Sequence, residues 1–546
     1  MKSLASRLGF WVVVLAILSA VNCGQSKTDD AYVTLLYGDE FLLGVRVLGK
    51  SIRDTGSTKD MVALVSDGVS DYAEKLLRAD GWIVQHISLL ANPNSVRPKR
   101  FWGVYTKLKI FNMTNYRKVV YLDADTIVIK SIDDLFKCRK FCANLKHSER
   151  LNSGVMVVEP SESIFTDMMS KVTTLYSYTG GDQGFLNTYY SDFPNAHLFE
   201  PDLSTDAMKT RPVPEMERLS TLYNADVGLY MLANKWMVDE KELKVIHYTL
   251  GPLKPWDWWT AWLLKPVDVW QNVRVKLEES LPGTGGGRNP HDQLLVQILF
   301  AFPVCLLFIC YYRSLLLASR DFTTKFSRSS VIDYVRRICL HYRSGTLPTY
   351  SGAGVASSSF VNTNQQFFSG THSKLPCYLG PISVVVCFMA TAFSLGFAFI
   401  LIPHQVTPWT GLLLMYEWTC MTFLVTFGGY LNFMYQWGKR TSDHSNYGRN
   451  DSSDHDSDKG FQRNVSRCDI VTWFYWLGMT SLAIVVPSLP YLFGITALFA
   501  RLGLMVGGGL VFSAFLAFAS EHLAIRAFIK GCEDFNQRLS RNICLC

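Results

Sequence analysis

The sequence predicts two parts of different class: an α/β domain with a mainly parallel sheet, followed by an α-helical, multi-span transmembrane domain. Up to about residue 290, short apolar runs alternate with amphipathic stretches, and beyond it long apolar runs alternate with polar loops. The mean hydropathy of +0.12 therefore averages an ordinary α/β half and a membrane half. With 546 residues, the chain is long enough for two or three domains.

Residues 1–25 have the composition of a secretory signal. Lys2 and Arg7 precede an apolar stretch from Leu8 to Val21, and small and polar residues follow. A basic segment followed by an apolar core of this length is typical of a signal peptide. We expect cleavage after this segment, and an uncleaved signal anchor is the alternative. Either outcome delivers the domain at residues 27–290 to the secretory lumen.

Residues 291–546 contain five apolar segments, each close to or above the roughly 20 residues that a spanning helix needs. They are residues 294–312, 379–402, 409–434, 470–492 and 495–519. The loops 313–376 and 435–469 carry many Lys and Arg residues, which predicts that both loops face the cytosol. With five spans, the domain that precedes them lies in the lumen.

Short β-rich runs alternate with helical stretches from residue 31 onward. The patterns predict strands at Ala31–Tyr37, Met61–Ser66 and Trp82–Ile87, and helices at Phe41–Arg53 and Asp71–Ala79. This βαβαβ order predicts a parallel sheet with helices on both faces. Ligands of such sheets bind beyond the carboxyl ends of the strands.

A strongly apolar strand predicted at residues 118–122 is followed by two carboxylates, Asp123 and Asp125, with one small residue between them. Alternate residues of a regular strand point to the same side, so both carboxylates can reach one site. Mg²⁺ and Mn²⁺ take oxygen ligands and often bridge carboxylates to substrate phosphates. Acidic pairs are also common in ordinary turns, so the motif alone leaves a structural role open.

A second polar group lies in the aromatic segment at residues 247–256. His247 can complete a metal site through its imidazole. Gly251 lets a phosphate approach the backbone closely, and Lys254 supplies positive charge for a diphosphate. Taken singly, a histidine in an aromatic stretch is more often structural, and a solvated role is the alternative for the lysine.

Charge and cysteine content narrow the class of function. The net charge of +7 is spread over loops without a dense basic block, which argues against nucleic-acid binding. Cys138 and Cys142 are the cysteines of the predicted luminal domain. Their spacing suits a local disulfide in an oxidising compartment, and a free pair is the alternative.

Residues 31–265 resemble the family 8 glycosyltransferases, the glycogenin-like group with a Rossmann-like GT-A fold. Five matches in the expected order carry the resemblance, and the element from His247 to Lys254-Pro255-Trp256 closes the set. The five are residues 33–37 with 44–49, Tyr105-Thr106-Lys107-Leu108, Asp123-Ala124-Asp125, Asn152-Ser153-Gly154-Val155 and Gly181-Asp182-Gln183-Gly184-Phe185-Leu186-Asn187. Each match is modest, but the ordered combination is specific.

The resemblance implies a role for each matched residue. It implies that Asp123, Asp125 and His247 hold a Mn²⁺ ion. Residues implied in catalysis are Asp182, Gln183 and Lys254, and those implied in substrate binding are Leu35, Tyr37, Lys107, Leu122, Ala124, Asn152, Gly154, Gly251 and Lys254. The sequence departs from the family at Gly38, where a polar uridine contact is missing, and at Thr179, where glycogenin has an acidic residue. No tyrosine is identifiable as a self-glucosylation site, so glycogen priming is not expected.

The whole chain resembles the plant members of the family that carry a multi-span C-terminal half. That resemblance implies a retaining transfer of glucuronic acid from UDP-glucuronate to a membrane sphingolipid, inositol phosphorylceramide, in the Golgi membrane. A donor carboxylate calls for a nearby cation. Arg100, Lys146 and Arg150 are candidates because they flank matched motifs, and ordinary surface charge is the alternative for each.

Three other functions stay open. A glucuronosyltransferase acting on a cell-wall polysaccharide such as xylan is the rival within the enzyme class, although a single anchor would suffice for that substrate. A catalytically inactive lipid-binding scaffold should have lost a metal ligand or a phosphate contact, and none is lost. A transporter should carry charges or repeats within its spans, and intramembrane charge is sparse.

Overall fold

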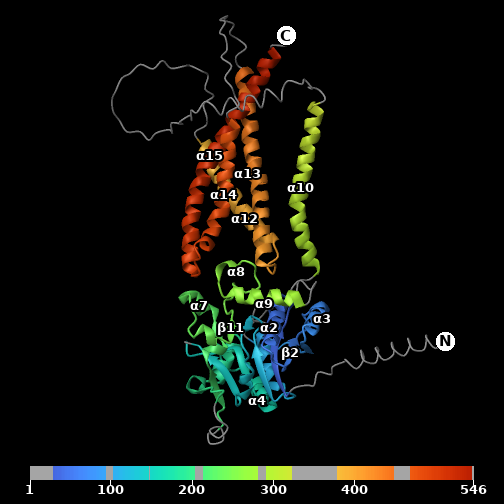
Figure 1. Cartoon of the computed structure of the whole chain (residues 1–546), viewed down its shortest axis with the longest axis vertical. Coiled ribbons are helices and arrows are strands. Elements are labelled where there is room, and N and C mark those ends of the chain that lie inside the picture. Colours follow the sequence, from blue (N-terminus) through green and yellow to red (C-terminus); the bar gives the residue numbers. More distant parts are fainter. Residues whose placement is uncertain are drawn as a thin grey trace, which may run out of the picture. The chain divides into compact units, whose positions relative to one another are not determined.

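The computed structural model of the chain describes residues 29–93, 103–146, 148–202, 213–280, 290–322, 378–447 and 468–543. The chain divides into two compact units. The first consists of Met1–Gln293 with Pro403–Leu412 and Ser488–Gly507, and the second of Leu294–Ile402, Leu413–Pro487 and Gly508–Cys546. The predicted signal segment, Arg100 and most of both predicted cytosolic loops lie outside the described residues. Figure 1 colours the α/β elements blue to green and the long C-terminal helices yellow to red.

Within the described residues, eight strands form the main sheet of the first unit, in the order β3-β2-β1-β4-β7-β6-β9-β8. The strands are β1 (Asp30–Leu36), β2 (Asp60–Val65), β3 (Ile83–His86), β4 (Lys118–Leu122), β6 (Phe141–Leu145), β7 (Leu151–Val158), β8 (His197–Leu198) and β9 (Met216–Leu219). The first four strands in this order run parallel, and β7 pairs antiparallel with both β4 and β6. A smaller sheet contains β10 (Ala225–Asp226), β11 (Val245–His247) and β5 (Thr126–Val128).

The helices of this unit connect the strands. They are α2 (Leu42–Asp54), α3 (Asp71–Ala79), α4 (Glu162–Lys171), α5 (Asp182–Tyr189), α7 (Val227–Ala233), α8 (Thr260–Leu263) and α9 (Val267–Ser280). Short 3₁₀ segments are η1 (Asp39–Phe41), η2 (Val104–Asn112), η3 (Asp133–Lys137), η4 (Phe193–Asn195), η5 (Thr221–Tyr223) and η6 (Glu240–Glu242). The predicted βαβαβ start is confirmed to within a residue at each end. Cys138 and Cys142 form a disulfide at the start of β6, which decides between the two alternatives for this pair.

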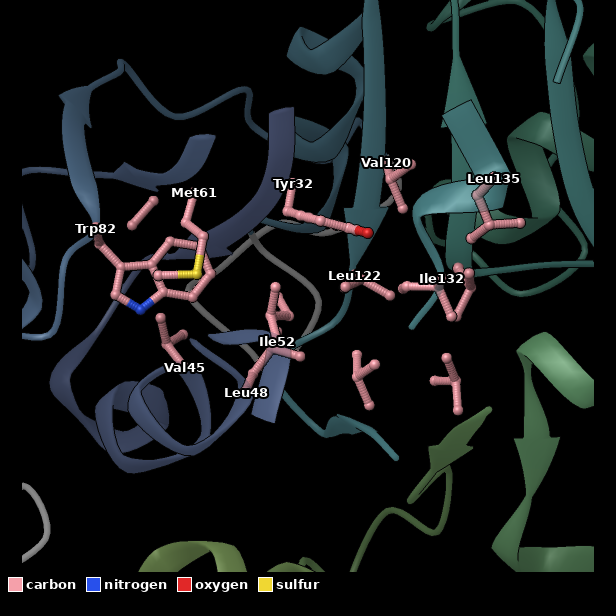
Figure 2. Close-up of a cluster of buried hydrophobic side chains, with 14 of the residues drawn as sticks. Tyr32, Val45, Leu48, Ile52, Met61, Trp82, Val120, Leu122, Ile132 and Leu135 are labelled. Carbon is pink, nitrogen blue, oxygen red and sulfur yellow. The ribbon is translucent and has the colours of Figure 1, made fainter. Parts of the chain in front are cut away.

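Two hydrophobic clusters cover opposite faces of the main sheet. On β1, Tyr32 and Leu36 belong to one cluster, and the alternating residues Val33 and Leu35 belong to the other. Such alternation is what a strand buried on both faces requires. Figure 2 shows the first cluster, in which side chains of α2 pack against Tyr32 and against a tryptophan that follows α3.

The first unit also incorporates two short segments from the C-terminal half. Arg274 of α9 is 1% exposed and donates hydrogen bonds to the carbonyl oxygens of Gln405 (2.9 Å) and Val406 (3.4 Å). Leu498 is buried in the same cluster as Trp256 and Trp270. The α/β domain is therefore completed by residues that follow it by more than a hundred positions.

Long helices make up the second unit, and the ends of several of them belong to the first unit. They are α10 (Pro290–Phe322), α12 (Leu379–Leu401), α13 (Pro408–Tyr447), α14 (Cys468–Leu492) and α15 (Leu498–Ile543). Among the described residues, four stretches are long and apolar enough to cross a membrane, and they lie in α12, α13, α14 and α15. They fit a multi-pass membrane protein. The remaining predicted span falls in α10, whose described apolar part, Gln293–Leu306, is shorter, so a count of five stays a prediction.

Replacing Arg274 with methionine should destabilise the first unit. The variant keeps most of the apolar stem but leaves two buried carbonyl oxygens without their charged donor, which costs about 1–3 kcal/mol. We expect a lower thermal unfolding midpoint for purified Arg274→Met protein in detergent. Lys276→Met, at an exposed position of the same helix, is the matched control. Equal midpoints for the two variants would show that the Arg274 contacts contribute nothing.

Candidate functional site

The two carboxylates of the Asp-x-Asp motif lie in the turn between β4 and β5. The backbone of Asp123 continues the sheet, since its N–H donates to the carbonyl oxygen of Gly154 (2.9 Å). The turn then closes as both the N–H (3.0 Å) and the hydroxyl (2.7 Å) of Thr126 donate to the carbonyl oxygen of Asp123. This turn directs the chain from the main sheet into the smaller one and leaves both carboxylates at the carboxyl end of β4.

The imidazole of His247 joins these carboxylates because β11 pairs antiparallel with β5, with His247 opposite Thr126. Its Nε2 lies 3.4 Å from Asp125 Oδ1 and 3.9 Å from Asp123 Oδ2. One ligand atom from each of the three residues lies within 4.8 Å of the others. This spacing suits a single divalent cation held by two carboxylates and an imidazole.

Asn224 sets the orientation of the imidazole. It is 0% exposed, and its Nδ2 donates to Asn152 Oδ1 (2.8 Å), which turns its Oδ1 toward Nδ1 of His247 (3.0 Å). Because an amide oxygen can only accept, Nδ1 must carry a proton, and Nε2, which faces the carboxylates, is the nitrogen available to a metal. Hydrogen bonds of this kind to the second nitrogen commonly fix the orientation of metal-binding histidines.

Two lysines balance the acidic groups. Lys107 of η2 lies 2.9 Å from Asp123 Oδ1 and 3.1 Å from Asp182 Oδ2, and Lys254 lies 2.5 Å from Asp125 Oδ2. Burial lowers the pKa of Lys107, but Asp123 and Asp182 outweigh this effect and hold the pKa well above its usual value. Burial raises the pKa of Asp125, yet Lys254 and His247 outweigh it and hold the pKa well below the usual range. Asp125 is therefore ionised, as a metal ligand must be.

These groups line a cavity of about 530 Å³, a size typical of small-molecule sites. The predicted residues that line it are Leu35, Tyr37, Lys107, Asp123, Ala124, Asp125, Lys146, Asn152, Gly154, Asp182, Gln183, His247 and Lys254. Leu122 does not, because its side chain lies in the hydrophobic core beneath the site. Gly251 and Arg150 are not among the lining residues, and Arg100 lies outside the described part of the chain.

The residues at the start of α5 are connected to the same network. Asp182 Oδ2 accepts a hydrogen bond from the hydroxyl of Ser153 (2.8 Å) as well as the ion pair with Lys107. Gln183 Oε1 accepts from Asn152 Nδ2 (3.0 Å). Asp182 and Gln183 therefore line the same cavity as the acidic pair, and Lys107 joins Asp182 to Asp123.

Sequence reasoning missed several residues of this site. Ser153 is one that the sequence could have indicated, because it lies inside the Asn152-Ser153-Gly154-Val155 motif. Thr249 likewise lies inside the segment 247–256; it lines the cavity and donates to Asp226 Oδ1 (2.6 Å). Asn224 and Asp226 lie in no recognisable motif, and Asp226 lines the cavity. A single sequence carries no signal for them, because their positions depend on how β10 and β11 pair.

Gly154→Ala should disrupt the metal site without unfolding the domain. A Cβ at this position would lie 2.0 Å from Cε1 of His247, so the ring must move away from the carboxylates. We expect the affinity for Mn²⁺ to fall by roughly 10–100-fold, measured as free Mn²⁺ by electron paramagnetic resonance. Gly181→Ala is the control, because it lines the same cavity and its Cβ would have no neighbour closer than 3.6 Å. Equal Mn²⁺ affinity in both variants would contradict the assignment.

Comparison with known proteins places this geometry in a family. The model of the family described as glycosyl transferase family 8 matches residues 33–140. The chain is 62% identical over 531 residues to inositol phosphorylceramide glucuronosyltransferase 1 of Arabidopsis thaliana, and the alignment covers 97% of each chain.

More distant relatives match the α/β part. A putative UDP-glucuronate:xylan α-glucuronosyltransferase 3 of Arabidopsis thaliana is 35% identical over 43% of this chain and 35% of its own length. The crystal structure of the galactosyltransferase LgtC aligns with 44% of this chain and 94% of its own, at 17% identity and a TM-score of 0.33. On the near full-length identity to the first of these relatives, the chain belongs to glycosyltransferase family 8, with a GT-A domain followed by membrane-type helices.

Proposed function

We propose that this protein transfers glucuronic acid from UDP-glucuronate to inositol phosphorylceramide. The observation that carries the proposal is the 62% identity over 97% of both chains to an enzyme named for this reaction. The alignment includes the C-terminal helices, whereas the xylan glucuronosyltransferase relative aligns with only 43% of the chain. Transfer to xylan is the weaker alternative for that reason. An inactive scaffold is disfavoured by the intact cluster of Asp123, Asp125 and His247.

A Mn²⁺ ion fits the cluster. Two carboxylates, one of them held ionised by Lys254, and an imidazole whose Nε2 faces them form a suitable ligand set. When bound, such an ion supplies Lewis acidity to the departing diphosphate. Asp123, Asp125 and His247 would hold it, and the choice of Mn²⁺ over Mg²⁺ follows from the family resemblance.

The charged and amide side chains of the cavity have separate proposed tasks. Lys254 lies beside Asp125 and would stabilise negative charge that develops on the diphosphate. Asn152 and Gln183, which are hydrogen-bonded to each other, would orient the donor sugar. Lys107 would hold Asp182 in place, because the two form an ion pair at 3.1 Å.

Retention of configuration is proposed to occur by attack on the front face of the sugar. A covalent route would need a carboxylate nucleophile, and Asp182 is the candidate. Its Oδ2 already accepts a hydrogen bond from Ser153 and pairs with Lys107, which lowers its nucleophilicity. This arrangement favours a role for Asp182 in positioning the donor, with the acceptor proton passing to a donor phosphate oxygen.

Lys146 is the proposed partner of the donor carboxylate. Of the three cations considered, it is the one that lines the cavity within the described residues. Its Nζ is held by the carbonyl oxygen of Asn224 (2.9 Å) and by Asp226 at 3.6 Å. Burial lowers the pKa of Lys146, and the pair with Asp226 offsets this only in part, so a further anionic partner would favour the charged form. Arg150 instead stacks over the ring of Tyr178 at 3.8 Å.

We propose a Golgi membrane location with the α/β domain in the lumen. The composition of residues 1–25 and the basic residues of loops 313–376 and 435–469 support this orientation. A disulfide between Cys138 and Cys142 agrees with an oxidising compartment.

An in vitro assay tests the proposed reaction directly. Purified full-length protein with Mn²⁺ should add one glucuronic acid to inositol phosphorylceramide from UDP-glucuronate, as read from the product mass. UDP-glucose should be used roughly ten- to a hundred-fold less efficiently, because a buried cation would face a neutral group. The folded Asp125→Asn variant is the control and should be inactive. Transfer to xylan oligosaccharides with no reaction on the lipid would overturn the acceptor and leave the family assignment intact.

Lys146→Gln should remove the preference for UDP-glucuronate. We expect the ratio of kcat/KM for UDP-glucuronate to that for UDP-glucose to fall by about ten-fold or more, since a charge-assisted contact of about 1.5–3 kcal/mol is lost. Arg150→Gln is the matched control and should leave the ratio unchanged. If Lys146→Gln lowers kcat/KM equally for both donors, Lys146 acts only by supporting Asn224 and His247.

A further inference from the structure

The segments that connect the membrane-type helices belong to the same compact unit as the donor cavity. Pro403–Leu412 joins α12 to α13, and Ser488–Gly507 joins α14 to α15. Both segments contact residues that follow β11: the N–H of Trp258 donates to the carbonyl oxygen of His404 (3.0 Å), and Tyr491 donates to that of Trp262 (3.0 Å). Three of the candidate spans, those in α13, α14 and α15, therefore have one end in the same compact unit as the α/β domain.

Aromatic rings surround this junction. The ring of Trp262 lies 4.9 Å from that of Trp409 and 5.3 Å from that of Tyr491. The guanidinium of Arg501 donates to the carbonyl oxygen of Trp262 (3.0 Å) and lies over the ring of Tyr491. Tryptophan and tyrosine are enriched where membrane proteins cross the lipid head groups, so the junction has the composition expected at the level of the bilayer surface.

The C-terminal end of α7 lies at this level. Asn234 ends the helix in the left-handed conformation (φ 52°), and its side-chain amide donates to the hydroxyl of Thr496 (3.1 Å). Thr496 stands in the short turn between α14 and α15. A residue of the α/β domain is thus hydrogen-bonded to the turn at which two candidate spans end.

Two large apolar side chains flank Asn234 and point into solvent. Leu232 is 63% exposed and Met237 is 65% exposed, and Asn234, which lies between them in the sequence, contacts the turn between α14 and α15. The exposed Lys235 lies between them, and a lysine beside apolar residues suits a surface of lipid phosphates. Following the chain from Leu232, the first acidic residue is Asp239.

We propose that residues 232–237, here called the α7 corner, insert into the lipid head-group region beside the α14–α15 turn. The partner is the bilayer surface itself, because the α7 corner is continuous with the ends of the spans through Asn234 and Thr496. The corner is a second membrane contact of the α/β domain, separate from the spans.

The contact has a geometric consequence for the cavity. Asp226, which caps the N-terminus of α7 through Gly228, also lines the cavity. A seven-residue helix is about 10 Å long, so the wall of the cavity lies about one helix length from the α7 corner. Insertion of the corner would hold the cavity within reach of groups that protrude from the membrane.

Depth-dependent quenching tests the proposal in the full chain. An environment-sensitive fluorescent amino acid replaces Leu232, Met237 or, as a control, Leu198, which is 54% exposed on edge strand β8; this avoids labelling native cysteines. The protein is placed in nanodiscs with and without lipids that carry a nitroxide near the head group. We expect at least two-fold quenching at positions 232 and 237 and none at 198.

Two outcomes would overturn the proposal. Emission at positions 232 and 237 that stays aqueous and unquenched would show that the α7 corner faces water. Blue-shifted emission without quenching would show that protein, such as a second copy of the chain, covers the corner in place of lipid. The measurement does not involve transfer of glucuronic acid, so the result of the quenching experiment is independent of the proposed reaction.

Discussion

The concentration of negative charge at the carboxyl end of β4 is the constraint on which the rest of the site depends. Asp123, Asp125 and Asp182 meet around one cavity, and like charges in a partly buried site disfavour ionisation unless cations balance them. Lys107 pairs with two of the carboxylates and Lys254 with the third. Because η2, α5 and the segment after β11 each supply one member of this balance, the electrostatics require these distant parts of the chain to converge.

The same charge balance is coupled by packing to the ends of the membrane-type helices. Gly44 of α2 stands where a side chain would not fit. A Cβ there would lie 2.6 Å from the carbonyl oxygen of Ala124 and 2.7 Å from the ring of Trp256. Trp256 in turn shares a buried cluster with Leu498, at the start of α15. A continuous path of packed atoms therefore connects the turn that holds the acidic pair to the first residues of a candidate span. Protein interiors are close-packed, so a displacement at one end of such a path is transmitted to the other.

Local patterns in the sequence were enough to predict the first strands and helices and the acidic pair, and the family resemblance supplied most of the other predicted residues that line the cavity. Asp123 and Asp125 were predictable because an apolar strand ends at them, and His247 because it begins a motif. Leu122 shows the limit: as the last residue of β4, its side chain alternates into the core. Asn224 and the contacts of Arg274 and Asn234 were beyond prediction, since each joins residues that only the tertiary fold brings together.

The shared core also bears on how the chain is made by the ribosome. The guanidinium of Arg274 donates to the carbonyl oxygen of Val406, 132 residues later in the chain. The carbonyl oxygen of Trp262 accepts a hydrogen bond from Arg501, 239 residues later. At roughly 5–20 residues per second of synthesis, the second interval lasts on the order of 12–48 s. During that time the α/β domain is present with part of its interior still uncovered. Completion of its core thus waits for synthesis of Ser488–Gly507, the last segment that this unit contains.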